Sequence, residues 1–155
     1  MLLIGRALNL LITKDMDKKA IIDKLSQIFT LELSGVIRYT HYSLMIVGYN
    51  RLPLIDFFKS QASESLTHAN LAGEHITGLG GNPPLNINNI HETFKHDIPE
   101  ILKETLEHEK KAIQTYYELL ELIDGKSVYL EEYARSMIGQ EELHVMEVEK
   151  MLKSN

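Results

Sequence analysis

Apolar residues recur every three or four positions along four long stretches of the chain, which is the period of an amphipathic α-helix. The stretches run from about 15–17 to 48–51, from 53 to 80–81, from 97 to 124–125, and from 127 to 152. Strand-like alternation is scarce, and Gly, Pro and Asn gather mainly between the stretches. The pattern predicts an all-α protein with four long helices.

Three local signals place the expected helix starts. Pro53 suits the first turn of the second helix, because a proline there gives up no intrahelical hydrogen bond. Asp97 followed by Glu100 has the spacing of a capping box, and Ser127 is a good N-cap for the fourth helix. Each of these three helices is therefore expected to begin at or just after the residue named.

The connections predict how the helices are joined. The first and third connections are short, so each should join two antiparallel helices. Residues 80–96 are rich in Asn and Pro. A segment of about 17 extended residues can reach roughly 55 Å, whereas a helix of about 27 residues spans roughly 40 Å. We therefore expect one ferritin-like four-helix domain over residues 15–155, with a long crossover between helices two and three, preceded by an apolar segment at 1–14.

The first and third helices share a stripe with a period of seven. It reads Leu25, Glu32, Tyr39, Ile46 in one helix and Leu102, Glu109, Tyr116, Ile123 in the other. Each stripe is otherwise apolar, and a buried carboxylate costs several kcal/mol unless its charge is compensated. Glu32 and Glu109 are therefore candidate ligands. The tyrosines either fill the core or hydrogen-bond the carboxylates.

Each pair of helices also supplies a histidine. His68 follows Glu32 by 36 residues, and His144 follows Glu109 by 35. In the fourth helix, Glu141 precedes His144 by three positions and so faces the same side. The corresponding position before His68 is Ser65, but Glu64 lies beside it. The predicted metal ligands are Glu32, Glu64, His68, Glu109, Glu141 and His144.

Oxygen-rich ligands with about one nitrogen per metal suit a pair of iron or manganese ions, and zinc can also bind such a set. The remaining histidines are expected to be ordinary core or surface residues, although His75 shares the face of His68; they are His41, His75, His91, His96 and His108.

The composition of the chain bears on its compartment and on the partners it can bind. The chain has no cysteine, which excludes disulfides and thiolate metal sites and makes the cytoplasm the expected compartment. A net charge of −6 argues against a nucleic-acid partner. The apolar run at residues 1–13 is too short to span a bilayer, so no membrane association is expected.

The chain resembles the bacterioferritins from about Asp17 to Leu152. The resemblance is clearest in LELSGVIRY at 31–39, in residues 109–116 and in GQEELH at 139–144. It implies a di-iron ferroxidase centre in which Glu32 and His68 serve one iron, Glu109 and His144 serve the other, and Glu141 bridges them. It also implies a hollow cage of subunits that stores ferric mineral.

The chain departs from this family at three places. A bridging glutamate of the family is Ser65 here, so one bridge is missing unless a helix bulge turns Glu64 inward. The methionine that ligates haem in the family is Leu66, so haem is not expected. Only eleven residues follow His144, so we expect no further helix of the kind that lines the family's four-fold channels.

The first hypothesis is an iron-storing ferroxidase that oxidises Fe(II) with dioxygen or peroxide. The alternatives are a small-assembly di-metal oxidoreductase or peroxide scavenger without mineral storage, and a structural subunit with a decayed site. We expect a homo-oligomer built on a two-fold dimer, because one small bundle cannot cover all of its apolar side chains, among them Tyr42, Tyr49, Phe57 and Phe58. Whether such dimers close into a cage is left open by the sequence. Residues 1–14 are a candidate interface element.

Overall fold

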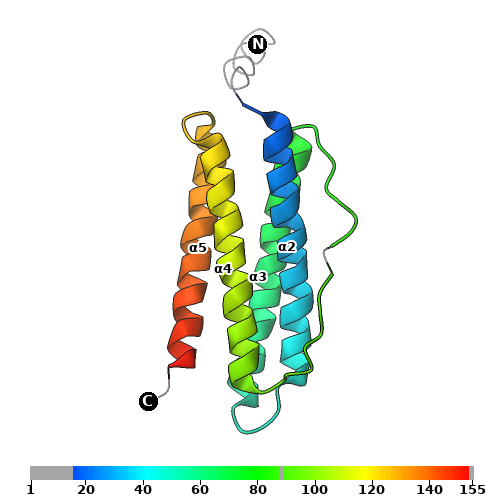
Figure 1. The fold of residues 1–155 in the computed structure, drawn as a ribbon, viewed down its shortest axis with the longest axis vertical. Coiled ribbons are helices and arrows are strands. Elements are labelled where there is room, and N and C mark those ends of the chain that lie inside the picture. Colours follow the sequence, from blue (N-terminus) through cyan, green and yellow to red (C-terminus); the bar gives the residue numbers. More distant parts are fainter. Residues whose placement is uncertain (1–15, 88, 154–155) are drawn as a thin grey trace.

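Four long helices make up the protein, and they are labelled α2–α5 in Figure 1. The structure is a computed structural model that describes residues 16–87 and 89–153. The helices are α2 (Lys18–Met45), α3 (Arg51–Gly78), α4 (Ile98–Ile123) and α5 (Val128–Leu152), and the described residues contain no strand. The all-α, four-helix prediction is confirmed. The segment 1–14, and the interface role predicted for it, lie outside the described residues.

The helices form two antiparallel pairs joined by one long crossover (Figure 1). Helix α2 pairs with α3, and α4 pairs with α5. The segment after α3 returns along α2 to the opposite end of the bundle, so α3 and α4 begin at the same end. This is the one-crossover topology of ferritin-like bundles, as the sequence predicted.

Two of the N-caps follow standard chemistry and a third does not. The side chain of Asp17 accepts a hydrogen bond from the backbone three residues on, and Ser127 does the same for α5. The capping box predicted at Asp97 is wrong, because its side chain makes no capping bond. Glu100 instead accepts a hydrogen bond from Lys103 Nζ at 2.7 Å.

The connection between α2 and α3 also differs from the prediction. Helix α2 ends at Met45, and the turn that follows contains Gly48 with φ at +97°, a conformation that favours glycine. Helix α3 begins at Arg51, two residues before Pro53. Proline is tolerated throughout the first turn of a helix, so Pro53 marks that turn without fixing its first residue.

The core consists of two apolar clusters with a polar layer between them. One cluster includes Ile21, Leu25, Ile28, Ile76, Leu119, Ile123, Tyr133 and Met137. The other consists of Tyr39, Tyr42, Ile46, Phe58, Ile101, Leu102 and Val148. The prediction that Tyr42 and Phe58 add exposed apolar area is wrong, because both are buried in this core. Tyr49 is fully exposed and Phe57 is half-buried.

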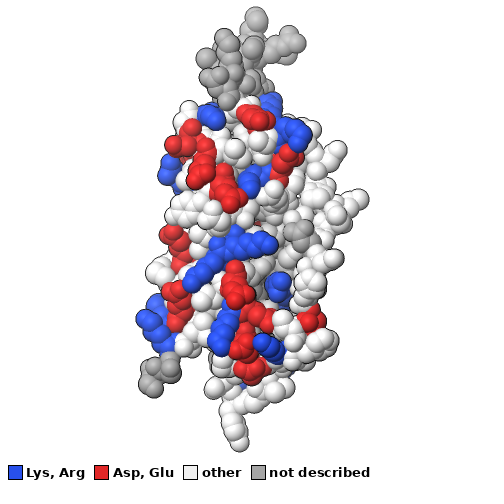
Figure 2. Space-filling view, in the orientation of Figure 1, with Lys and Arg blue, Asp and Glu red and all other residues white. Residues whose placement is uncertain are grey.

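Acidic and basic side chains are mixed on the face of the described structure that Figure 2 shows. On the face drawn in Figure 2, Lys and Arg side chains are interspersed with Asp and Glu, and no broad basic patch forms. Among the described helices, none combines the length and the apolar character needed to cross a membrane.

Candidate metal centre

Five buried or half-buried ionisable side chains, contributed by all four helices, meet in the polar layer of the bundle. They are Glu32 from α2, His68 from α3, Glu109 from α4, and Glu141 and His144 from α5. Their potential ligand atoms fall into two groups, in each of which the atoms lie within 4.8 Å of one another. One group is Glu32, His68 and Glu141; the other is Glu109, Glu141 and His144.

Glu141 is common to both groups and offers one oxygen to each. Its Oε1 lies 2.9 Å from Nδ1 of His68, and its Oε2 lies 3.3 Å from Nδ1 of His144. Glu32 Oε1 lies 3.5 Å from the same nitrogen of His68, and Glu109 Oε2 lies 3.9 Å from that of His144. The two halves are therefore similar in composition and meet at one carboxylate.

The two stripe tyrosines hydrogen-bond the carboxylates across the bundle. Tyr116 of α4 donates its hydroxyl to Glu32 Oε1 of α2 at 2.8 Å, and Tyr39 of α2 donates to Glu109 Oε1 of α4. Both tyrosines are also almost completely buried. Of the two roles left open by the sequence, the structure shows both at once: the rings pack in the core while the hydroxyls orient the candidate ligands.

Burial and mutual contact shift the protonation of the centre. Burial raises the pKa of Glu109 well above its usual range, and a hydrogen bond to Glu141 adds to this effect. Burial also raises the pKa of Glu32, although its hydrogen bond with His68 opposes the shift. Burial alone would lower the pKa of His68, but its hydrogen bonds with Glu141 and Glu32 outweigh this and raise it to about 10. The metal-free centre thus holds protons that a bound cation must displace.

Glu64, the sixth predicted ligand, lies apart from both groups. Its Oε2 is 3.3 Å from Nε2 of His144, the nitrogen on the other side of the ring from the one that faces Glu141. Helix α3 is α-helical from Arg51 to Gly78, so the bulge that would turn Glu64 inward is not formed. The structure places Glu64 against the outer side of His144, where it can orient the ring.

Ser65 occupies the buried position three residues before His68 and lies close to α2. A Cβ atom added to Gly35 would come within 2.8 Å of Ser65 Oγ and 3.1 Å of His108 Nε2. The glycine therefore allows α2 and α3 to approach each other beside the centre. Burial lowers the pKa of His108 to about 4, which keeps this imidazole uncharged at neutral pH.

The other histidines have different surroundings. His75 packs against the rings of Tyr129 and Tyr133 and belongs to neither ligand group, as expected for a core histidine. His41 and His96 were also expected to be ordinary, yet they lie together with Glu92 in a third group of potential ligands. No sequence signal indicated this group, because His41 precedes the crossover residues by about fifty positions.

The donor chemistry of the centre fits a pair of divalent cations. Three carboxylates and two imidazoles from four helices form an oxygen-rich, largely buried set in which each half has one nitrogen. Iron and manganese prefer such a set, and zinc also accepts it. The residues that would hold the ions are Glu32, His68, Glu109, Glu141 and His144.

Comparison with known proteins agrees with this architecture. A crystal structure of ferritin-like diiron-carboxylate proteins from Bacillus anthracis is 28% identical, covers 88% of this chain and 98% of its own, and has a TM-score of 0.84. The bacterioferritin-related protein of Bacteroides fragilis, a dodecameric thioferritin, is 23% identical and has a TM-score of 0.84. The match covers 92% of the present chain and 89% of the Bacteroides chain.

The bacterioferritin of Desulfovibrio desulfuricans, a protein with a diiron site, is 24% identical and has a TM-score of 0.77. The match covers 87% of the present chain and 79% of the Desulfovibrio chain. At 23% and 24% identity, the similarity to the Bacteroides and Desulfovibrio structures establishes a shared fold. A comparison with curated proteins found no match. The family model for the ferritin-like domain matches residues 22–154, which is most of the chain. The protein therefore belongs to the ferritin-like family.

Proposed function

We propose that the protein binds Fe(II) in pairs, oxidises it with dioxygen or peroxide, and sequesters the ferric product. The observation that carries this proposal is the position of Glu141, whose two oxygens face the two halves of the centre separately. A carboxylate so placed can hold two cations close together, which favours a reaction in which both ions deliver electrons to one oxidant. Manganese or zinc in the same centre would not support this iron chemistry.

The surrounding side chains prepare the centre for this task. The hydroxyls of Tyr116 and Tyr39 restrict Glu32 and Glu109, so that these carboxylates lose less freedom when a cation binds. His68 and His144 present Nδ1 to the centre and must give up their protons before they can act as ligands. The protein thus supplies an oriented, buried set of donors whose occupancy depends on proton release.

We also propose that the protein assembles as a homo-oligomer built on an antiparallel two-fold dimer, and that dimers can close into a cage. Apolar side chains are exposed around the turn between α2 and α3, namely Leu44, Val47, Tyr49 and Leu52. Such a patch is typical of an interface. The Bacteroides fragilis relative is a dodecamer, which supports assembly of this fold into larger particles.

A second candidate is a di-metal oxidoreductase or peroxide scavenger that turns over without storing mineral. Ser65 favours this candidate, because it replaces one bridging carboxylate with a hydroxyl and leaves the two halves joined mainly by Glu141. Solution mass distinguishes a cage from a small assembly. Metal content distinguishes both candidates from a structural subunit with a decayed site.

The proposed function is tested by adding Fe(II) to the metal-free protein under anaerobic conditions and then admitting oxygen or peroxide. We expect two rapidly oxidised Fe(II) ions per chain, followed by continued uptake if the protein stores iron. A matched control is Glu142→Gln, which alters an exposed neighbour of Glu141 on the same helix. Oxidation no faster than in buffer, with normal folding, would contradict the proposal.

A further inference from the structure

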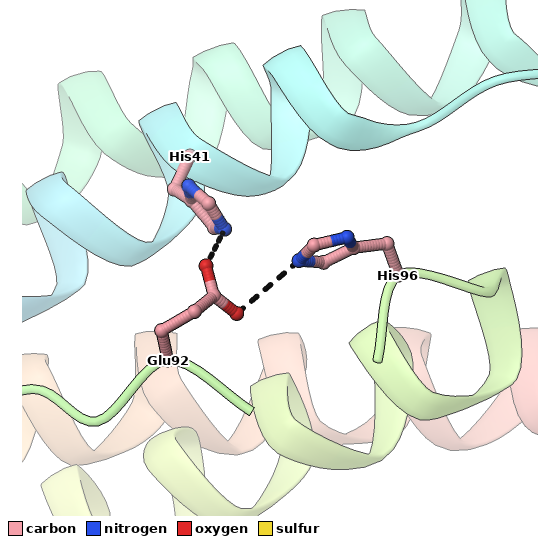
Figure 3. A group of neighbouring side chains, drawn as sticks. All are labelled: His41, Glu92 and His96. Carbon is pink, nitrogen blue, oxygen red and sulfur yellow. Dashed lines mark hydrogen bonds and ion pairs between the residues drawn. The ribbon is translucent and has the colours of Figure 1, made fainter. Parts of the chain in front are cut away.

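A second cluster of potential metal ligands lies at the surface, where the crossover passes α2. It consists of His41 from α2 and of Glu92 and His96 from the segment that leads into α4 (Figure 3). Nε2 of His41 lies 2.7 Å from Glu92 Oε2, and Nε2 of His96 lies 3.2 Å from Glu92 Oε1. Figure 3 shows both imidazole rings directed toward the carboxylate.

The spacing of these atoms suits one cation with additional water ligands. The three candidate ligand atoms lie within 4.8 Å of one another. A tetrahedral zinc ion with bonds of about 2.0–2.2 Å keeps its ligand atoms about 3.4 Å apart. Beside the cluster is a cavity of about 200 Å³, lined in part by His41 and Glu92. It has room for the water molecules that would complete the coordination.

The two imidazoles share one carboxylate. Nε2 of His41 is buried and lies 2.7 Å from Glu92 Oε2, but the two atoms do not meet hydrogen-bond geometry. The ring centroids of His41 and His96 are 5.5 Å apart, with the Glu92 carboxylate between the two Nε2 atoms. One divalent ion at this position would bind both nitrogens and a Glu92 oxygen at once.

The backbone holds Glu92 in position. The N–H of Phe94, whose φ is +58°, donates to Glu92 Oε1 at 2.8 Å. The hydroxyl of the intervening Thr93 donates to Glu104 of α4 at 2.5 Å. The crossover is therefore already attached to α4 near the cluster, and a cation bound by His41 would attach it to α2 as well.

We propose that His41, Glu92 and His96 form a second metal site, separate from the bundle centre, which binds a divalent transition-metal ion such as Zn²⁺. Two imidazole nitrogens and one carboxylate, with water in the open positions, are a common ligand set for this ion. A bound ion fastens the crossover to α2 and stabilises the folded chain in proportion to its affinity.

The test uses Zn²⁺ as the probe on the full chain. In crystals soaked with Zn²⁺, anomalous scattering at the zinc edge should show a peak within about 2.5 Å of His41 Nε2, His96 Nε2 and a Glu92 oxygen. In calorimetric titrations, His96→Ala should bind one Zn²⁺ fewer per chain, or bind it at least about tenfold more weakly. His91→Ala, which removes an exposed histidine of the same segment outside the cluster, should titrate like the unmodified chain.

Three results would overturn the proposal. The first is a soaked crystal with zinc at the bundle centre and none beside His41. The second is a His96→Ala variant that binds zinc with unchanged stoichiometry and affinity. The third is an equal loss in His91→Ala and His96→Ala, which would mean that histidines of this segment attract zinc without a defined site. Because the cluster is at the surface, these variants are expected to keep their helix content and melting temperature without metal.

Discussion

Replacing Glu141 with Gln tests whether this carboxylate is the one that bridges the two halves of the centre. The substitution keeps the shape of the side chain but removes a charge that faces both halves of the centre. A hydrogen bond to a charged group contributes about 1.5–3 kcal/mol, and we apply this range to each contact of the Glu141 carboxylate. Because Glu141 has one such contact in each half, we expect roughly 10- to 150-fold weaker Fe(II) binding in both halves.

Glu64→Gln is the matched comparison. Within the centre, Glu64 contacts the outer nitrogen of His144, at 3.3 Å; it also accepts a hydrogen bond from Gln61 at 3.4 Å, and its side chain is 35% exposed. Solvent screening limits such a contact to about 1 kcal/mol or less. The expected loss is therefore below about fivefold and confined to the half that contains His144.

The assay is anaerobic Fe(II) titration by calorimetry, with Glu142→Gln as a control for loss of a surface charge on the same helix. We expect Glu141→Gln to weaken both binding events, Glu64→Gln to weaken at most one, and Glu142→Gln to weaken neither. If Glu64→Gln weakens both events as much as Glu141→Gln does, the bridge has been assigned to the wrong glutamate.

Three further predictions concern the Tyr116 hydroxyl, the protonation of His68 and the binding of haem. Tyr116→Phe should slow Fe(II) oxidation by about 10-fold or more by freeing Glu32, while the exposed Tyr117→Phe should not change the rate measured by ferric absorbance. Because the pKa of His68 rises from 6.5 to about 10 on folding, the metal-free protein should be stabilised below pH 6.5 and lose that stability as the pH rises toward 10; a urea midpoint that does not fall over this range would contradict it. The protein should show no Soret band after haem reconstitution, since Leu66 lacks the sulfur of the methionine that ligates haem in the bacterioferritins; a stoichiometric bis-methionine spectrum would refute this.

The sequence predicted the bundle and the position of its centre because both depend on regular spacing. A single carboxylate that takes one place in an apolar stripe with a period of seven cannot avoid the core, so Glu32 and Glu109 were identifiable without coordinates. The nearly equal Glu-to-His separations, 36 and 35 residues, then indicated two similar halves. The crossed bonds from Tyr39 and Tyr116 could be proposed only as one of two alternatives, since a tyrosine in a stripe serves equally well as a core residue.

Other features depend on contacts that spacing does not encode. Glu64 and Ser65 are adjacent on α3, and only the rotation of that helix decides which of them is buried. At the predicted capping box, the Asp97 side chain makes no capping bond and the Glu100 carboxylate pairs with Lys103 instead, a choice between local partners that spacing does not decide. The surface cluster around Glu92 was missed because the crossover has no period from which its position against α2 could be calculated.

The most direct test of the central claim is a crystal structure after Fe(II) soaking, with anomalous data collected at the iron edge. We expect two iron peaks per chain, one within about 2.5 Å of His68 Nδ1 and one within about 2.5 Å of His144 Nδ1, with the carboxylate of Glu141 between them. A weaker peak beside His68 would agree with the bridge lost at Ser65. A map with no iron near either His144 or Glu141 would refute the proposed di-iron centre.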